Sequence, residues 1–315
     1  MIKVILLALG LLSVVVLYSV FLNLTPVHFN QDELGFSLNA YEISKTGFDE
    51  NGRFMPLYFW HLGVMWATPL IVYLTAIFLK FFTVGEIVVR LPSVIIGVAN
   101  VILIYILAKK VFKSEFYAFV AALILALTPI HFIHSRILLD ILYPVPFVIL
   151  WLLFLIKFLE NKKRKFLFFA GVVLGFGFYS YHAARVMMPF YILATIVFLL
   201  PEIKRNRQLA AWLLGGFLLP LLPLVPWTIQ YPETLFADQV RYVGITSLFS
   251  MESLMHRLDV FISYFNPIYL FLLGDASLIH STSLHHPLGL LKSSVHAGVF
   301  LIPLAIFIPL GIYES

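Results

Sequence analysis

The sequence predicts an all-α polytopic membrane protein. Hydrophobic residues make up 61% of its 315 residues, charged residues only 12%, and the mean hydropathy is +0.98. Soluble domains carry about 25% charged residues, so a soluble fold of this length could not bury so much apolar surface. Disorder is excluded because the chain is too apolar. The absence of Cys excludes disulfides, iron–sulfur clusters and thiol chemistry.

Stretches without Asp, Glu, Lys or Arg define the spanning helices, because a helix needs about 20 mostly apolar residues to cross a bilayer. We expect one integral membrane domain over 1–315, with long external loops at 25–90 and 229–293 and no soluble C-terminal domain. The eight expected helices cover residues 3–24, 91–108, 116–134, 141–158, 166–183, 186–201, 209–228 and 294–312.

Three of the apolar segments need separate comment. The first run is too long for a signal peptide and lacks a small-residue cleavage site, so we expect an anchor. The window 260–274 is too short and contains an Asn-Pro pair, which favours an interfacial or re-entrant segment. The glycines Gly171, Gly175 and Gly177 in the fifth helix indicate close helix packing rather than nucleotide binding.

The basic residues set the orientation of the helices. They fall in clusters at 109–113, 162–165 and 204–207, and the positive-inside rule places all three in the cytoplasm. If residues 67–82 crossed the membrane, all three clusters would lie outside. We therefore expect 31–90 to be external, with amphipathic helices resting on the bilayer. The three cytoplasmic clusters account for the net charge of +5, so no nucleic-acid partner is expected.

The first external loop and the mouth of the second helix carry the first candidate site residues. Asp32 and Glu33 follow the first helix; they either flank it or serve as a general base or metal ligand, and the residues leave both interpretations open. Arg90 is a cation on the outer side, against the positive-inside pattern. It is either a snorkelling side chain or, as we favour, an anion site for a lipid phosphate.

Two later external turns are also polar. Arg136 and Asp140 are four residues apart, and an ion pair that closes a helical turn is favoured over catalysis. The second turn suits a polar headgroup pocket better than interfacial decoration; its residues are Tyr179, Tyr181, His182 and Arg185.

The late external loop contains Asp275, His280, His285 and His286. This spacing matches no standard zinc pattern, so a solvated loop is favoured and no metal ligand is assigned, although a divalent metal stays possible. The chain has no P-loop, Rossmann glycine pattern, zinc-protease motif or Gly-x-Ser-x-Gly elbow, which argues against an ATPase, a redox enzyme and a serine hydrolase.

The order of these motifs resembles the family-39 glycosyltransferases, which include protein O-mannosyltransferases and lipid A aminoarabinose transferases and have the membrane fold called GT-C. The resemblance covers about residues 26–290. Family members usually carry more helices, and often a soluble part, beyond this point; a fragment, a short form or an inactive remnant would end as this chain does. The matching segments are Gln31-Asp32-Glu33, Pro69 to Leu74, Arg90 to Ser93, Ser135 to Asp140, Tyr179 to Arg185, and Gly274-Asp275 with His280.

The resemblance implies a polyprenyl-phosphate-linked sugar as donor and a hydroxyl on a protein, lipid or glycan as acceptor. It implies inversion at the anomeric carbon, with Asp32 as general base and Glu33 as its support. It implies phosphate contacts from Arg90, His182 and Arg185. The substrate pocket is expected to involve Tyr179, Tyr181, Arg136, Asp140, Asp275 and His280.

Other functions compete with this interpretation. A transporter or flippase tends to place ionisable groups at the bilayer midplane, whereas here they collect at the ends of the helices. A non-catalytic protein that binds the lipid carrier, or a glycan polymerase, is harder to separate, and the acidic pair at Asp32 and Glu33 is the discriminating feature. We expect a bacterial inner membrane, with the site facing the periplasm.

Overall fold

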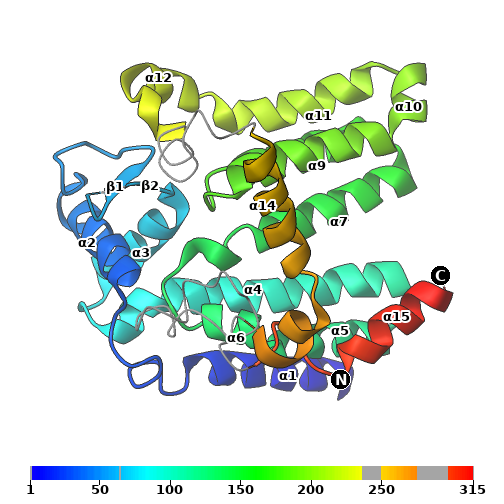
Figure 1. The fold of residues 1–315 in the computed structure, drawn as a ribbon, viewed down its shortest axis with the longest axis horizontal. Helices are drawn as coiled ribbons and strands as arrows, with labels where there is room; N and C mark the ends of the chain where they lie inside the picture. The colour runs from blue at the N-terminus through cyan, green and yellow to red at the C-terminus, as the bar shows by residue number, and fades with distance from the viewer. Residues whose placement is uncertain (1, 64, 236–249, 275–296, 315) are drawn as a thin grey trace.

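The computed structural model describes residues 2–63, 65–235, 250–274 and 297–314. Most of them form helices that lie side by side in a bundle (Figure 1). This arrangement confirms the predicted all-α membrane fold in outline. The bundle helices are α1 (Ile2–Ser19), α4 (Glu86–Phe112), α5 (Glu115–Leu127), α7 (Val145–Asn161), α8 (Arg164–Gly177), α9 (Ala184–Phe198) and α11 (Gln208–Leu218).

The lengths of the helices differ from the prediction. Among the described residues, two stretches are long and apolar enough to cross a bilayer alone, Glu86–Phe112 and Asp140–Asn161. The pair Gln208–Leu221 and Leu224–Gln230, bent by 47°, is a possible third. The count of eight therefore stays a prediction. The shorter apolar helices are Leu7–Ser19, Pro69–Phe81, Glu115–Leu127 and Ala184–Phe198.

Prolines cause two of the interruptions. The expected helix 116–134 is divided into α5 and α6 (Pro129–His134), because proline has no backbone N–H and disfavours helical backbone in the residue before it. The expected helix 209–228 becomes α11, the 3-10 turn η2 (Leu219–Leu221) and α12 (Leu224–Gln230), with two prolines at the bend. The sequence windows were free of charge but not free of helix breakers.

The segment between α1 and α4, which we expected to be external, folds onto one end of the bundle. It contains α2 (Gln31–Thr46), the antiparallel strands β1 (Phe59–His61) and β2 (Met65–Ala67), and α3 (Pro69–Phe81). The expected helices are present, but the hairpin was not predicted, because its residues belong to a charge-free apolar run. The buried face of α2 packs with α3 through residues spaced one and two turns apart, namely Phe36, Ala40 and Ile43.

Helices α8 and α11 approach each other at backbone distance. A Cβ added to Gly171 would lie 2.2 Å from the Leu213 carbonyl oxygen, and one added to Gly216 would lie 2.1 Å from that of Phe168. A Cβ at Gly175 would lie 2.5 Å from the Phe217 carbonyl oxygen. The close packing predicted from the glycines of the fifth helix is confirmed.

The three basic clusters meet at one end of the bundle. Lys110, at the end of α4, pairs with Glu160, at the end of α7, with 2.6 Å between Nζ and Oε2. Lys162 Nζ lies 3.7 Å from Oε1 of Glu202 in α10 (Leu200–Arg205). The segments expected to be external meet at the opposite end. The side of the membrane that each end faces stays a prediction.

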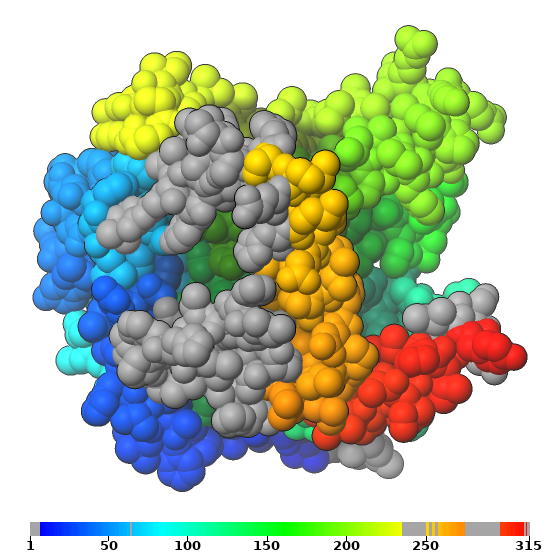
Figure 2. All heavy atoms as spheres, in the orientation of Figure 1, coloured from blue at the N-terminus to red at the C-terminus, as the bar shows by residue number. Residues whose placement is uncertain are grey.

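The last described segments cross the others. After η3 (Pro232–Leu235) come α14 (Met251–Ser263) and the π-helix η4 (Tyr269–Leu273), and α14 lies across the face of the bundle (Figures 1 and 2). The window 260–274 thus holds the end of α14 and η4. The final helix is α15 (Leu304–Glu314), which begins later than the expected 294–312.

Candidate active site

The two adjacent acids after α1 differ in exposure. Asp32 and Glu33 lie in the first turn of α2. The side chain of Asp32 is 34% exposed, whereas that of Glu33 is 1% exposed. A carboxylate that reacts with a substrate has to be accessible. Asp32 therefore meets this requirement, and Glu33 is part of the protein interior.

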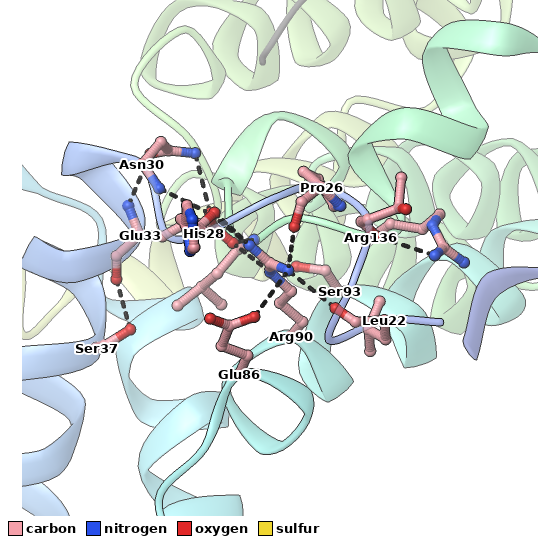
Figure 3. A network of polar contacts seen from close by, with 12 residues as sticks. Leu22, Pro26, His28, Asn30, Glu33, Ser37, Glu86, Arg90, Ser93 and Arg136 are labelled. Carbon is pink, nitrogen blue, oxygen red and sulfur yellow. Dashed lines mark hydrogen bonds and ion pairs between the residues drawn. The ribbon is translucent and has the colours of Figure 1, made fainter. Parts of the chain in front are cut away.

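Five hydrogen bonds fix the Glu33 carboxylate. Its Oε1 accepts from Arg90 Nε and from the backbone N–H of Leu138, both at 2.9 Å. Its Oε2 accepts from Arg90 Nη2 at 3.2 Å, and from the backbone N–H and the side-chain Nδ2 of Asn30 at 3.1 and 3.2 Å (Figure 3). The Asn30 side chain accepts in return from the Glu33 N–H, which completes a capping box. These partners offset the cost of burying the carboxylate and fix the turn that carries Asp32.

Arg90 is fully buried within the second turn of α4. Besides its two bonds to Glu33, its Nη1 donates to the carbonyls of Leu22 at 2.9 Å and Pro26 at 3.0 Å, and its Nη2 donates to that of His28 at 2.8 Å. These contacts engage all five N–H groups of the guanidinium. Arg90 is thus neither a snorkelling cation nor a phosphate site; it fixes the loop after α1.

The predicted ion pair between Arg136 and Asp140 is wrong. The chain leaves α6 at His134, so the two residues do not share a helical face. Asp140 begins the 3-10 turn η1 (Asp140–Leu142) and accepts a hydrogen bond from Thr68 Oγ1 at 2.8 Å. The guanidinium of Arg136 instead donates to the carbonyls of Leu17, Tyr18, Val20 and Thr25, at 2.7 to 3.0 Å.

The turn after α8 lies against the hairpin. The expected helix 166–183 ends at Gly177, and Arg185 lies in the first turn of α9 instead of in a loop. Arg185 Nη1 donates to the Thr234 carbonyl at 2.8 Å, and its guanidinium lies 4.6 Å from the centre of the Tyr58 ring. A longer contact of 3.4 Å joins Nη2 to the Trp66 carbonyl. Arg185 is half-buried, so part of its side chain stays accessible to a ligand at this end of the bundle.

The aromatic residues of this turn have different environments. Tyr179 is buried, and its hydroxyl donates to the Pro220 carbonyl at 3.0 Å. Its ring lies 6.1 Å from that of Tyr58, so Tyr179 packs inside the protein. Tyr181 and His182 are half-buried. Of the predicted pocket residues in this turn, Tyr181, His182 and Arg185 are therefore the accessible ones.

His61 and Thr68 were missed by the sequence analysis. His61 ends β1, and its Nε2 lies 3.6 Å from Asp32 Oδ1. Burial lowers the pKa of His61, while the carboxylates of Asp140 and Glu50 oppose this shift. Both residues belong to a charge-free run that resembles an apolar segment. The run folds into a hairpin, which brings His61 to Asp32 and Thr68 to Asp140. No local sequence pattern predicts these contacts.

Two predicted pocket residues, Asp275 and His280, lie outside the described residues. Within the ranges that the structure does describe, no three His, Asp or Glu side chains converge on a possible metal site. Asp32, His61, Asp140 and Arg185 form the candidate site. In it a carboxylate can accept a proton, and the guanidinium of Arg185 can bind an anion.

This helical membrane bundle has the GT-C fold. The fold is similar to that of ArnT from Cupriavidus metallidurans, at a TM-score of 0.57 and 15% identity over 92% of this chain. The match covers 53% of ArnT, so this chain spans about half of that protein's length. The oligosaccharyltransferase AglB from Archaeoglobus fulgidus matches over 82% of this chain and 36% of AglB, with 16% identity and a TM-score of 0.48.

The family described as dolichyl-phosphate-mannose-protein mannosyltransferase matches residues 67–229, which is more than half of the chain. The chain belongs to this family. The matched range includes Arg90, Asp140 and Arg185 and begins after Asp32 and Glu33. None of the curated proteins matches the chain.

Proposed function

We propose that this chain transfers a sugar from a polyprenyl-phosphate donor to an acceptor hydroxyl, with Asp32 as general base. The observation that carries the proposal is the accessible Asp32 carboxylate on a helix turn that the buried Glu33 fixes to Arg90 and Leu138. Membership of the mannosyltransferase family supports the reaction class. The acceptor is a hydroxyl of a protein, lipid or glycan, and we place the site on the periplasmic face of a bacterial inner membrane.

The reaction is a single displacement at the anomeric carbon. The acceptor oxygen attacks from one face, and the bond to the phosphate oxygen breaks on the other, so that the polyprenyl phosphate leaves with the bonding electrons and the configuration inverts. The hydroxyl proton passes to the Asp32 carboxylate. A carboxylate of ordinary pKa suffices when proton transfer is late, as it is in a transition state that resembles an oxocarbenium ion.

The leaving phosphate needs fixed cations or donors. Because Arg90 is fully engaged, we assign this role to Arg185, with His182 beside it in the chain. Arg185 touches the carbonyl of Trp66 in β2, and β2 is paired with the strand that carries His61 next to Asp32. The hairpin therefore connects the proposed base to the proposed phosphate site. Tyr181 lies in the same turn and can pack against the sugar or the prenyl chain.

Asp32→Asn tests the proposal directly. We expect turnover of radiolabelled polyprenyl-phosphate sugars to fall by about 10²- to 10⁴-fold, because the amide cannot accept the proton. Binding of the donor should be retained. The measurement is sugar transfer to a membrane extract, with the anomeric configuration of the product read by NMR.

Glu42→Gln is the matched control, because Glu42 lies on the same helix and its carboxylate belongs to no part of the proposed site. Near-normal turnover of Asp32→Asn would refute the base assignment. A product with retained configuration would refute the single displacement.

A further inference from the structure

The imidazole of His61 is held against the face of α2 that carries Asp32. Its side chain is 3% exposed, and its ring centre lies 4.5 Å from that of Phe36. Asp32, Gly35 and Phe36 are spaced three and four residues apart and so share one helical face. His61 is therefore positioned by the packing of α2, not only by the hairpin.

Gly35 makes the room for this ring. A Cβ added there would lie 2.5 Å from His61 Cε1 and 2.8 Å from His61 Nδ1. Glycine inside a helix destabilises it relative to alanine, so a glycine in the second turn of α2 needs a compensating reason. The close packing of the His61 ring against Gly35 supplies that reason.

The surroundings of the ring select one tautomer. His61 Nδ1 is buried and has no hydrogen-bond partner among the described residues. Its Nε2 faces the Asp32 carboxylate, which can only accept. A neutral imidazole carries one N–H, and this arrangement places it on Nε2. The distance of 3.6 Å exceeds that of a hydrogen bond, but such contacts at reactive sites shorten when substrate binds.

Two more carboxylates act on the ring. Glu50, in the loop after α2, and Asp140, in η1, favour its protonation, and burial opposes them with the larger effect. Glu33, the neighbour of Asp32, faces away toward Arg90. The His61 ring is thus a neutral donor beside the proposed base.

We propose that His61 is a positioning residue for Asp32, which donates from Nε2 to the carboxylate and holds it ionised and oriented toward the acceptor hydroxyl. This inference rests on the proposed role of Asp32. The contact itself does not depend on which sugar or acceptor the protein uses.

The test compares His61→Phe with His61→Gln in the full chain in detergent. Phenylalanine keeps the packing against Phe36 and removes the donor; glutamine restores an N–H near the position of Nε2. We expect His61→Phe to raise the pKa of Asp32 by about one unit, because a donor to the charged form is lost. His61→Gln should restore most of the shift. The readout is an infrared pH titration of the Asp32 carboxyl, isolated by subtracting Asp32→Asn.

Turnover gives the second readout. We expect kcat to fall about 10-fold in His61→Phe at an unchanged KM for the donor, and to recover in His61→Gln. Gly35→Ala should lower kcat as well by displacing the ring. Glu50→Gln is the control: it removes a nearby carboxylate and leaves the donor to Asp32 in place.

The outcomes separate this inference from the proposed function. An unchanged Asp32 titration in His61→Phe would overturn the positioning role, whatever the turnover. If His61→Phe does not fold, Gly35→Ala replaces it, and an unchanged Asp32 titration in that variant is likewise a refutation. Full activity of Asp32→Asn would instead refute the base, while the titration still reports on the contact.

Discussion

The two ends of the bundle use ion pairs in opposite ways. At the basic end, Lys109 and Glu115 are 51% and 46% exposed although their charged atoms are 2.6 Å apart. At the other end, Arg90 and Glu33 are 0% and 1% exposed. Exposed pairs contribute little because water screens them. A buried pair is tolerated only when every donor and acceptor is paired, and then it fixes geometry. One end of the bundle is thus solvated, and the other is built to hold a side chain in place.

Glu33→Gln tests the buried end and has the largest expected effect on stability. It should lower the free energy of unfolding by about 3–5 kcal/mol, because the charge of Arg90 stays buried without its partner. The measurement is denaturant unfolding in detergent, with Glu42→Gln as the control on the same helix. A loss below about 1 kcal/mol would show that the network is not what fixes the turn of Asp32.

Gly216→Ala probes the helix contact that joins the two ends. The added methyl would clash with the Phe168 carbonyl, which as part of the backbone cannot rotate away. We therefore expect the free energy of unfolding to fall by about 1–3 kcal/mol. Gly215→Ala is the adjacent control, because a Cβ there meets nothing within 4 Å. The same unfolding assay applies, and equal behaviour of the two variants would contradict the close approach of α8 and α11.

Lys110→Ala should have the smallest effect. The side chains of Lys110 and Glu160 are 34% and 46% exposed, so water screens the pair and its removal should cost at most about 1 kcal/mol. A double-mutant cycle with Glu160→Ala, at low and high salt, measures the coupling. A coupling as large as that expected at Glu33 would remove the contrast between the two ends.

The features predicted from the sequence are those encoded by local patterns. Charge-free windows indicated the membrane class, the glycines at 171, 175 and 177 indicated the close packing, and the three basic clusters do lie at one end. The interpretation of Arg136 and Asp140 failed because the four-residue rule assumes that the helix continues, and it ends at His134.

The rest depends on contacts between distant residues. Arg90 meets Glu33 across 57 positions, and Arg136 meets Leu17 across 119. No spacing rule joins such pairs, so in the sequence a buried arginine looks the same as an exposed one. The expectation that Asp32 rather than Glu33 is the base agrees with their exposure, but its chemistry stays a prediction.

The hydrogen bonds that fix the loop after α1 and the turn of Asp32 can form only in a set order during synthesis. The distant donors, namely Arg90, Arg136 and the N–H of Leu138, are all synthesised after the carbonyls and the carboxylate that accept from them. When the turn of Asp32 leaves the ribosome, only the local capping box between Asn30 and Glu33 can hold it. The network around this turn can therefore be completed only after residue 138 has been synthesised.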